Sequence, residues 1–486
     1  MNQTTEAYRG NDRLLFGIIL GVLGFWLFAQ TTLNIAPDMA ADLQVGQSFM
    51  NIAVSITALF SGIFIVVIGG LADRVGRVRI LMLGFGFSIV GSLLVGLAPS
   101  GAMGGTFLML GRVCQGLSGA FVMPSSLALV KAYWDGAERQ RAISLWSMGS
   151  WGGSGFAALF GGLMAENVGW RWIFIMGAVV SLIGMLMVRG TPESKAPSKE
   201  GYQFDLTGVL TFMVAMVALQ VFATQGAQFG WTSPASLGLL AAAVVFGLAF
   251  YRVESGNPHA FVQFGLFRNL TYTGATISNL LLNATSGIVM VAMLLLQQGG
   301  SMTAQRAGLL TIGYAITILV FIRVGEKLLQ RFGPREPMLW GSYIVGLSIV
   351  LLMPTNLMLG PYTVLAVIAF SLFGLGLAFY ATPSTDAALS NLPADQTGAG
   401  SGIYKMASSL GASFGVAISS TIYTAIAGHN EAIRWIEGVI TFEGRQENLA
   451  SREAAFFALL ANLVMLAAAV LSILVTVPKG KTAEPG

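Results

Sequence analysis

Long apolar stretches that carry almost no charge recur along the whole chain. Only 10% of the 486 residues are Asp, Glu, Lys or Arg, and 55% are hydrophobic, whereas soluble domains have roughly 25% charged residues. A transmembrane helix needs about 20 consecutive, mostly apolar residues, and the sequence has such stretches many times over. The sequence therefore predicts an all-α protein that crosses a membrane repeatedly, and it excludes an ordinary soluble enzyme.

Charged residues, glycines and prolines divide the apolar stretches into fourteen predicted membrane spans. The predicted spans cover residues 13–36, 47–72, 80–98, 105–131, 142–166, 171–189, 205–225, 235–253, 272–298, 307–329, 338–354, 361–391, 398–428 and 454–477.

Lys and Arg residues are distributed unevenly between the two sides that these spans define. With both termini in the cytoplasm, 18 of the 26 basic residues fall in cytoplasmic segments, 5 in outer segments and 3 within spans. Cytoplasmic loops of membrane proteins collect basic residues, so the asymmetry predicts cytoplasmic N- and C-termini. It also accounts for the net charge of +4, and because no basic run exists, we expect no nucleic-acid partner.

The residue types needed for a metal site, a disulfide or an enzymatic nucleophile are scarce. The chain has one cysteine, Cys114, and two histidines, His259 and His429, which are far apart in the sequence. An internal disulfide and a thiolate metal cluster are therefore excluded, and no nucleophile–base pair is recognisable. We expect a protein that is not an enzyme and that needs neither a metal nor a cofactor.

The two halves of the sequence resemble each other at a nearly constant offset. Gly76 in DRVGRVR matches Gly333 in QRFGPRE, and Pro124 in AFVMPSS matches Pro383 in FYATPST. Duplicated bundles of this kind bind substrate near the bilayer midplane, where the halves meet. The predicted domains are an N-terminal six-helix bundle (1–189), a cytoplasmic linker with two inserted transmembrane helices (190–271), and a C-terminal six-helix bundle (272–486) with an outer loop at 429–453.

The sequence GGLADRVGRVRIL at 69–81 joins the second and third predicted spans on the cytoplasmic side. Gly76 permits a tight turn between two helix ends. Asp73, Arg74 and Arg77 can form a charge network that latches neighbouring helices together. The alternative is a solvated loop that merely carries positive charge, but the spacing GxLADRxGR favours the latch.

This loop resembles the signature loop of the major facilitator superfamily, and the number of spans resembles its family of 14-helix drug:proton antiporters. The strings NIAVSITALFSG (51–62), GWRWIFI (169–175), YATPSTDAA (380–388) and GIYKMAS (402–408) are similar to those of staphylococcal Nor-type quinolone exporters. The similarity extends from about residue 9 to residue 477. It implies the major facilitator fold, a multi-pass location in the bacterial cell membrane, and proton-coupled multidrug efflux that confers antibiotic resistance.

Arg112 lies within the fourth predicted span, in the string LMLGRVCQGLSGA at 108–120. A charged side chain in a membrane helix is costly unless it faces a cavity or a partner. The family resemblance implies that Arg112 takes part in proton coupling. The alternative is a structural arginine that caps carbonyl groups of an adjacent helix.

Acidic residues that could carry the proton are few. Asp386 lies near the predicted cytoplasmic end of the twelfth span and is either a proton carrier or an ordinary helix-end acid. Glu326 follows Arg323 by three residues on one helix face, and it is either functional or paired with that arginine. The first span lacks the aspartate that many related pumps have and carries Gln30 and Asn34 instead.

Lys405 places a positive charge in the thirteenth span, where related pumps tend to carry acids. Its ammonium group either extends to the cytoplasmic interface or faces the transport cavity. Pumps for lipophilic dications need carboxylates in the cavity, whereas the charge within these spans leans positive. Amphiphiles that carry a carboxylate, such as quinolones, fit this balance better. The predicted substrate-binding residues are Trp26, Gln30, Asn34, Trp151, Asn279, Asn283, Tyr380, Tyr404 and Lys405.

The predicted function is proton-coupled export of amphipathic, quinolone-like compounds, zwitterionic or cationic, by alternating access. The predicted partners are these small molecules, protons and the lipid bilayer, and we expect a monomer. Two alternatives are a transporter of a carboxylated metabolite that exports drugs incidentally, and a sensor or scaffold that transports nothing.

Overall fold

A computed structural model describes residues 8–480 except 30, 102, 197–204, 258, 259, 261, 263, 303 and 428–447. Every secondary-structure element in these described residues is helical. Eleven of the helical segments are long and apolar enough to cross a membrane. The chain divides into two compact units, of which the first comprises residues 1–213, 252–266 and 389–405, and the second comprises 214–251, 267–388 and 406–486.

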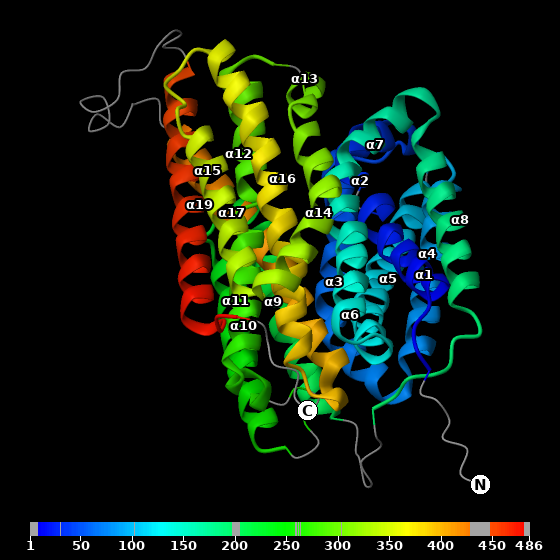
Figure 1. Ribbon diagram of the computed structural model, residues 1–486. Helices are drawn as coiled ribbons and strands as arrows, with labels where there is room; N and C mark the ends of the chain where they lie inside the picture. Colours follow the sequence, from blue (N-terminus) through cyan, green and yellow to red (C-terminus); the bar gives the residue numbers. More distant parts are fainter. Residues whose placement is uncertain are drawn as a thin grey trace, which may run out of the picture. The chain divides into compact units, whose positions relative to one another are not determined.

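The first unit is built mainly from the N-terminal helices (Figure 1). Its helical segments are α1 (Asp12–Leu23), the π-helical turn η1 (Gly24–Ala29), α2 (Thr32–Leu43), α3 (Gln47–Val75), α4 (Arg77–Gly96), α5 (Gly104–Tyr133), α6 (Gly136–Ser147), the π-helical turn η2 (Met148–Gly152), α7 (Gly153–Asn167) and α8 (Trp170–Val188). Four longer helices begin or end in this unit and continue in the other, namely α9 (Leu206–Phe229), α10 (Pro234–Ser255), α16 (Leu359–Ser390) and α17 (Thr397–Ala427).

The second unit is built mainly from the C-terminal helices. Its remaining segments are α11 (Leu270–Ala284), α12 (Gly287–Leu294), η4 (Leu295–Gly299), α13 (Ala304–Leu309), α14 (Ile312–Phe332), α15 (Arg335–Leu352) and α19 (Leu449–Thr476), while the short 3-10 turns η3 (Phe264–Arg268) and η5 (Ala394–Gln396) lie on the connections.

Each of the fourteen predicted spans falls on a helical segment, which confirms the predicted fold class. The count of fourteen is not reproduced by length and apolarity alone, because three segments fall outside the eleven. The predicted span 142–166 is divided by η2 into two helices of 12 and 15 residues. The other two are α9, in which only a shorter apolar stretch is found, and α15. The predicted domain boundaries at residues 189 and 271 stay a prediction.

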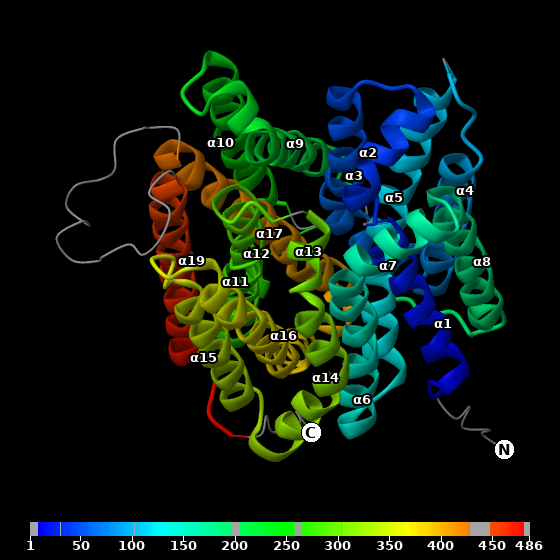
Figure 2. The same ribbon diagram turned by 90° about the horizontal axis from the view of Figure 1, so that it is seen from above.

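Glycines let the helices of the first unit approach closely. A Cβ atom on Gly91 of α4 would lie 2.8 Å from the Gly111 carbonyl oxygen of α5, and the reverse distance is also 2.8 Å. Small residues at helix contacts are the usual means of tight packing in membranes. The helix α8 packs against α1 and α4, as Figure 2 shows.

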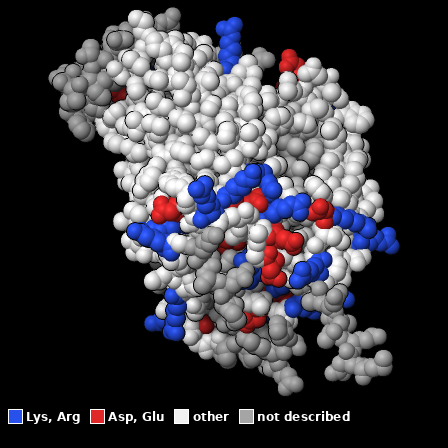
Figure 3. Space-filling model, in the orientation of Figure 1, with Lys and Arg blue, Asp and Glu red and all other residues white. Residues whose placement is uncertain are grey.

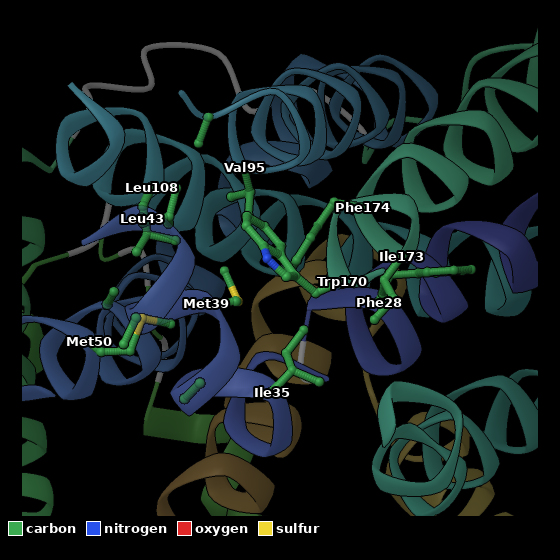
Figure 4. Packing of buried hydrophobic residues seen from close by; sticks show 14 residues of the cluster. Phe28, Ile35, Met39, Leu43, Met50, Val95, Leu108, Trp170, Ile173 and Phe174 are labelled. Atoms are coloured by element: carbon green, nitrogen blue, oxygen red, sulfur yellow. The ribbon is translucent and has the colours of Figure 1, made fainter. Parts of the chain in front are cut away.

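The apolar core of the first unit brings together side chains from α2, α3, α4, α5 and α8 (Figure 4). Met39 and Leu43 of α2 are fully buried, and Trp170 and Phe174 of α8 are at most 6% exposed. The Trp170 indole nitrogen donates a hydrogen bond to Asp42 at 2.9 Å. Because a buried indole N–H needs an acceptor, Asp42 satisfies the polar edge of this core.

The second unit packs its helices in the same way. A Cβ atom on Gly411 or Gly415 of α17 would overlap the carbonyl oxygens of Leu280 and Ala284 of α11. The helix α19 packs against both α11 and α15 (Figure 2). These contacts leave the outward faces of the helices apolar.

Charged side chains occupy little of the molecular surface. On the face drawn in Figure 3 most of them gather in the lower half of the view, a few lie at its upper end, and most of the remaining surface is uncharged. Leu248, Val364 and Val475 are apolar yet 61–73% exposed. Extended apolar exposure of this kind suits a lipid environment and not water. The protein is therefore a multi-pass membrane protein.

Candidate functional site

The turn between α3 and α4 is built around Gly76. Its φ of +132° lies in a region that only glycine adopts readily. The Glu193 carboxylate accepts hydrogen bonds from the backbone N–H groups of Val78 at 2.8 Å and Arg79 at 3.1 Å. It thereby caps the free N–H groups at the start of α4. The sequence motif identified Gly76, but Glu193 lies more than 100 positions away and was missed.

Asp73 is the centre of a buried charge network. Its side chain is 3% exposed and accepts hydrogen bonds from Arg77 at 2.8 and 3.0 Å. The second carboxylate oxygen accepts the backbone N–H groups of Gly398 at 2.7 Å and Ala399 at 3.2 Å. These two residues lie in the first turn of α17, where the helix dipole favours an anion. Asp73 therefore neutralises Arg77 and caps α17 at the same time.

Further bonds hold residues 389–401 against the first unit, to which they belong. Arg77 donates to the Ala394 carbonyl oxygen at 2.8 Å, and Lys131 of α5 donates to the Leu389 carbonyl oxygen at 2.5 Å. A Cβ atom on Gly398 would overlap the Gly69 carbonyl oxygen of α3. The predicted latch residues Asp73, Gly76 and Arg77 thus come together with a segment that the sequence did not link to them.

Arg74 links the Asp73 network to two acidic residues of the inserted helices. It interacts electrostatically with Asp73, and also with Asp205 and Glu254 at the ends of the inserted helices α9 and α10. Glu254 was placed outside the membrane spans by the sequence and was not considered as a functional acid. No motif marks this pair, because its members are about fifty positions apart.

Arg112 is 1% exposed and lies among backbone carbonyl groups. It donates hydrogen bonds to the carbonyl oxygens of Ala29 at 2.6 Å and Ala53 at 3.0 Å, and to Gln115 at 2.8 Å. Ala29 ends the π-helical turn η1, where the regular helical bond pattern is interrupted. The guanidinium group therefore supplies donors to carbonyls of two other helical segments, the arrangement that the structural alternative described.

Lys405 is 4% exposed and lies under an aromatic ring. Its ammonium nitrogen is 4.6 Å from the centroid of the Trp146 ring, which is the geometry of a cation–π interaction. The Trp146 indole nitrogen donates to the Ser126 hydroxyl at 2.9 Å, so the ring is fixed in place. No acidic side chain among the described residues forms an ion pair with Lys405. Trp146 is one of several aromatic residues that the sequence offers for an apolar cavity, but its contacts with Lys405 and Ser126 were not predicted.

A polar cluster occupies the contact of α11 with α16 and α17 in the second unit. The Asn279 amide donates to the Ser408 hydroxyl at 2.6 Å, and the Asn283 amide donates to the Asn279 side-chain oxygen at 2.9 Å. One residue before Asn279, the hydroxyl groups of Ser278 and Tyr380 are 2.8 Å apart. The predicted binding residues Asn279 and Asn283 are therefore brought together, and Tyr380 bonds to the neighbouring residue Ser278 of the same helix.

The two predicted proton carriers lie on separate helices of the second unit. Glu326 of α14 is 4% exposed, forms an ion pair with Arg323 of the same helix, and accepts from Gln330 at 3.3 Å. Asp386 of α16 is 2% exposed, so it is buried and does not project into water as an ordinary helix-end acid would.

The remaining predicted binding residues are dispersed. Trp26 lies in η1 beside Gly153, and its buried indole nitrogen has no hydrogen-bond partner among the described residues. Trp151 lies in η2 and is half-buried, and Tyr404 is buried in α17. Gln30 and the side chain of Asn34 lie outside the part of the chain that the structure describes.

Known proteins resemble both the sequence and the fold. The model of the Major Facilitator Superfamily matches residues 14–416 and 275–482. The "Quinolone resistance protein NorB" of Staphylococcus aureus strains MRSA252 and JH9 is 43% identical over 422 residues, which cover 87% of this chain and 90% of each relative. The solved structure of the proton:xylose symporter XylE, bound to 6-bromo-6-deoxy-D-glucose, has a TM-score of 0.65 at 14% identity and covers 97% of this chain and 96% of its own.

The match to XylE confirms the predicted fold. The family match and the relatives confirm the prediction of a transporter of small molecules instead of an enzyme. By the extent of the family match and by its identity to the relatives, this chain belongs to the major facilitator superfamily of membrane transporters.

Proposed function

We propose that the protein is a proton-driven exporter of amphipathic, quinolone-like compounds that works by alternating access. The observation that carries this proposal is the 43% identity, over 87% of the chain, to relatives named for quinolone resistance. Three further features support it: Lys405 is buried beside the Trp146 ring, Asp73 caps the start of α17, and Arg112 is buried. The termini and the loop 69–81 lie on the cytoplasmic side in this proposal, and the protein acts as a monomer.

The Asp73 network acts as the conformational latch. In one state Asp73 caps α17 and neutralises Arg77, as the hydrogen bonds of 2.7 and 2.8 Å support. In the other state the start of α17 leaves α3, and Arg77 remains as the partner of Asp73. Because charge-assisted hydrogen bonds are the strong ones, this contact biases the equilibrium between the two states.

Lys405 and Trp146 recognise the substrate's charge and ring system. The ammonium group has no carboxylate partner in the described part of the chain, so a substrate carboxylate would supply the missing counter-ion. The Trp146 ring and the nearby Tyr404 offer flat apolar surfaces for an aromatic drug. Asn279, Asn283, Tyr380, Trp26 and Trp151 contribute further contacts in this proposal, together with Gln30 and Asn34.

Proton coupling requires a group that binds and releases a proton during the cycle. Asp386 and Glu326 are the proposed carriers, since both are buried acids in helices of the second unit. Arg112 is the proposed fixed charge of the coupling machinery. Its bonds to Ala29 and Ala53 support a second role, in which it holds η1 and α3 in place.

Transport of a carboxylated metabolite is the second candidate function, and Lys405 favours it as well. Transport assays in inverted membrane vesicles distinguish these two functions. Fluoroquinolone uptake driven by an imposed pH gradient, and competed by many apolar drugs, supports the proposed exporter. Tight saturation by one carboxylated metabolite with no drug competition supports the alternative, and complete absence of flux would leave only a sensor or scaffold.

A further inference from the structure

Two acidic side chains, Asp205 and Glu254, meet at the ends of the inserted helices. Asp205 precedes α9 and Glu254 lies in the last turn of α10, and they are 7% and 3% exposed. The Gly208 backbone N–H donates to one Asp205 oxygen at 2.9 Å. A methyl group on Gly208 would overlap both the second Asp205 oxygen and a Glu254 oxygen. The two carboxyl groups therefore share one small buried space.

These oxygen atoms lack donors. The second oxygen of Asp205 and both oxygens of Glu254 are buried without a hydrogen-bond partner in the described part of the chain. The backbone N–H of Val262 faces Glu254 without reaching hydrogen-bond geometry. The two carboxyl groups are within hydrogen-bond range of each other, but two ionised carboxylates are both acceptors. One proton between them would supply the donor that both lack.

The charged group that interacts with this pair is Arg74, near the end of α3. Arg74 interacts electrostatically with Asp205 and Glu254, and also with Asp73 on its other side. The pair thus presents two negative charges to one arginine when it is ionised, and one negative charge when it holds a proton. Two carboxylates in one buried site seldom ionise together. In the described residues no group of three or more His, Cys, Asp or Glu side chains could hold a metal ion.

We propose that Asp205 and Glu254 form a proton-binding site, distinct from Arg112, Glu326 and Asp386. The site holds one proton between the two carboxyl groups and lies beside the signature loop. Proton binding changes the charge that Arg74 faces. Arg74 adjoins Asp73, so the state of the pair reaches the contact between Asp73 and the first turn of α17. This last link rests on the proposed function, whereas the proton site does not.

Infrared difference spectroscopy of the purified full-length protein, titrated from acidic to alkaline pH, tests the site. The wild type should show a protonated-carboxyl C=O absorption that remains at pH values where exposed carboxyl groups are already ionised and that disappears as the pH rises further. We expect this absorption to be lost in both Glu254→Gln and Asp205→Asn. Both substitutions preserve side-chain size, and the amide oxygen introduced by Asp205→Asn still accepts the Gly208 N–H. Glu138→Gln, at an exposed acid of α6, should leave this absorption unchanged.

Titration spectra of Glu254→Gln and Asp205→Asn that match the wild type would overturn the proposal. So would stabilisation of the wild type, but not of Glu254→Gln, by Mg²⁺ or Ca²⁺, since that result would assign the pair to a metal. The measurement uses no substrate. A protein that shows the absorption but transports no drug would therefore retain this site and lose the proposed function.

A separate experiment tests whether the proton-binding site acts on the contact between Asp73 and α17. Hydrogen exchange of the peptide that contains Gly398 and Ala399 should depend on pH beyond the intrinsic chemical rate in the wild type. Glu254→Gln should lose this extra dependence, because its amide carries no charge at any pH. Equal pH dependence in the two proteins would show that the proton site does not act on the latch.

Discussion

The carboxylate of Asp73 accepts the backbone N–H of Gly398 at 2.7 Å, although 325 positions separate the two residues in the sequence. The same carboxylate holds Arg77, one turn along the chain, at 2.8 Å. One buried anion thus satisfies a cation on one helix and the free N–H groups at the start of another. Loss of the Asp73 charge should therefore weaken both the ion pair with Arg77 and the capping of α17.

Asp73→Asn should abolish transport and lower stability. The asparagine keeps the shape of the side chain but leaves Arg77 buried without its counter-ion, and breaking a buried pair in this way costs about 3–5 kcal/mol. Drug efflux and thermal unfolding of the purified protein measure the two effects. Glu138→Gln, which removes an exposed carboxylate, is the matched control. Wild-type efflux and melting temperature in Asp73→Asn would contradict a latch role.

Gly398→Ala should separate α17 from α3. The added methyl group would overlap the Gly69 carbonyl oxygen, so the helix start must shift and its bond to Asp73 must lengthen. We expect faster hydrogen exchange at residues 398–399 and reduced efflux. Gly238→Ala is the control, since a Cβ atom there has no neighbour within 4 Å. Equal exchange in the two variants would show that the close approach is unimportant.

A lysine should not be able to replace Arg112, so Arg112→Lys should be impaired in both stability and transport. A lysine ammonium is a single compact group, whereas the planar guanidinium reaches Ala29, Ala53 and Gln115 from different nitrogens. Carbonyl groups left without donors cost about 1–3 kcal/mol each, so we expect a lower melting temperature and little efflux. Arg189→Lys, at an exposed position, should behave as the wild type. Full efflux in Arg112→Lys would show that charge alone suffices.

Lys405→Glu should change which drugs are exported. The substitution reverses a buried charge beside Trp146, so carboxylate-bearing quinolones should lose and monocations such as ethidium should gain relative resistance. Resistance profiles of cells that express each variant at equal level measure this shift. Lys327→Glu reverses an exposed charge and should leave the ratio unchanged. A uniform loss for all drugs would indicate a structural role for Lys405.

Much of the fold follows from the sequence because lipid imposes strong rules. Apolar runs, basic loops and the internal repeat locate the helices to within a few residues, as α4 and α8 show. The breaks inside helices do not follow, because a π turn such as η1 depends on partners from other helices. Nothing in the string GFWLFA announces that Arg112 will take the carbonyl of Ala29.

The candidate site could be predicted only where a motif concentrates its residues. Asp73, Gly76 and Arg77 stand within five positions and were found together. Asp205 and Glu254 were missed because helix packing, and no local pattern, brings them together over Gly208. Lys405 was found by its charge, but its contact with Trp146 could not be predicted, since aromatic residues are too common in a membrane protein for any one of them to be identified as a partner.

The π turn Gly24–Ala29 has a consequence for the phase of the first span. A π turn contains an additional residue relative to an α turn, and one residue rotates an α-helix by about 100°. Side chains after η1 are therefore rotated, relative to those before it, from the directions that they would have in a continuous α-helix. Val22 of α1 lies beside Gly149 of η2, while Ile35 and Met39 of α2 reach the core of Figure 4. Deletion of one residue within this turn would rotate every later side chain of the span, so chain length here is as constrained as residue identity.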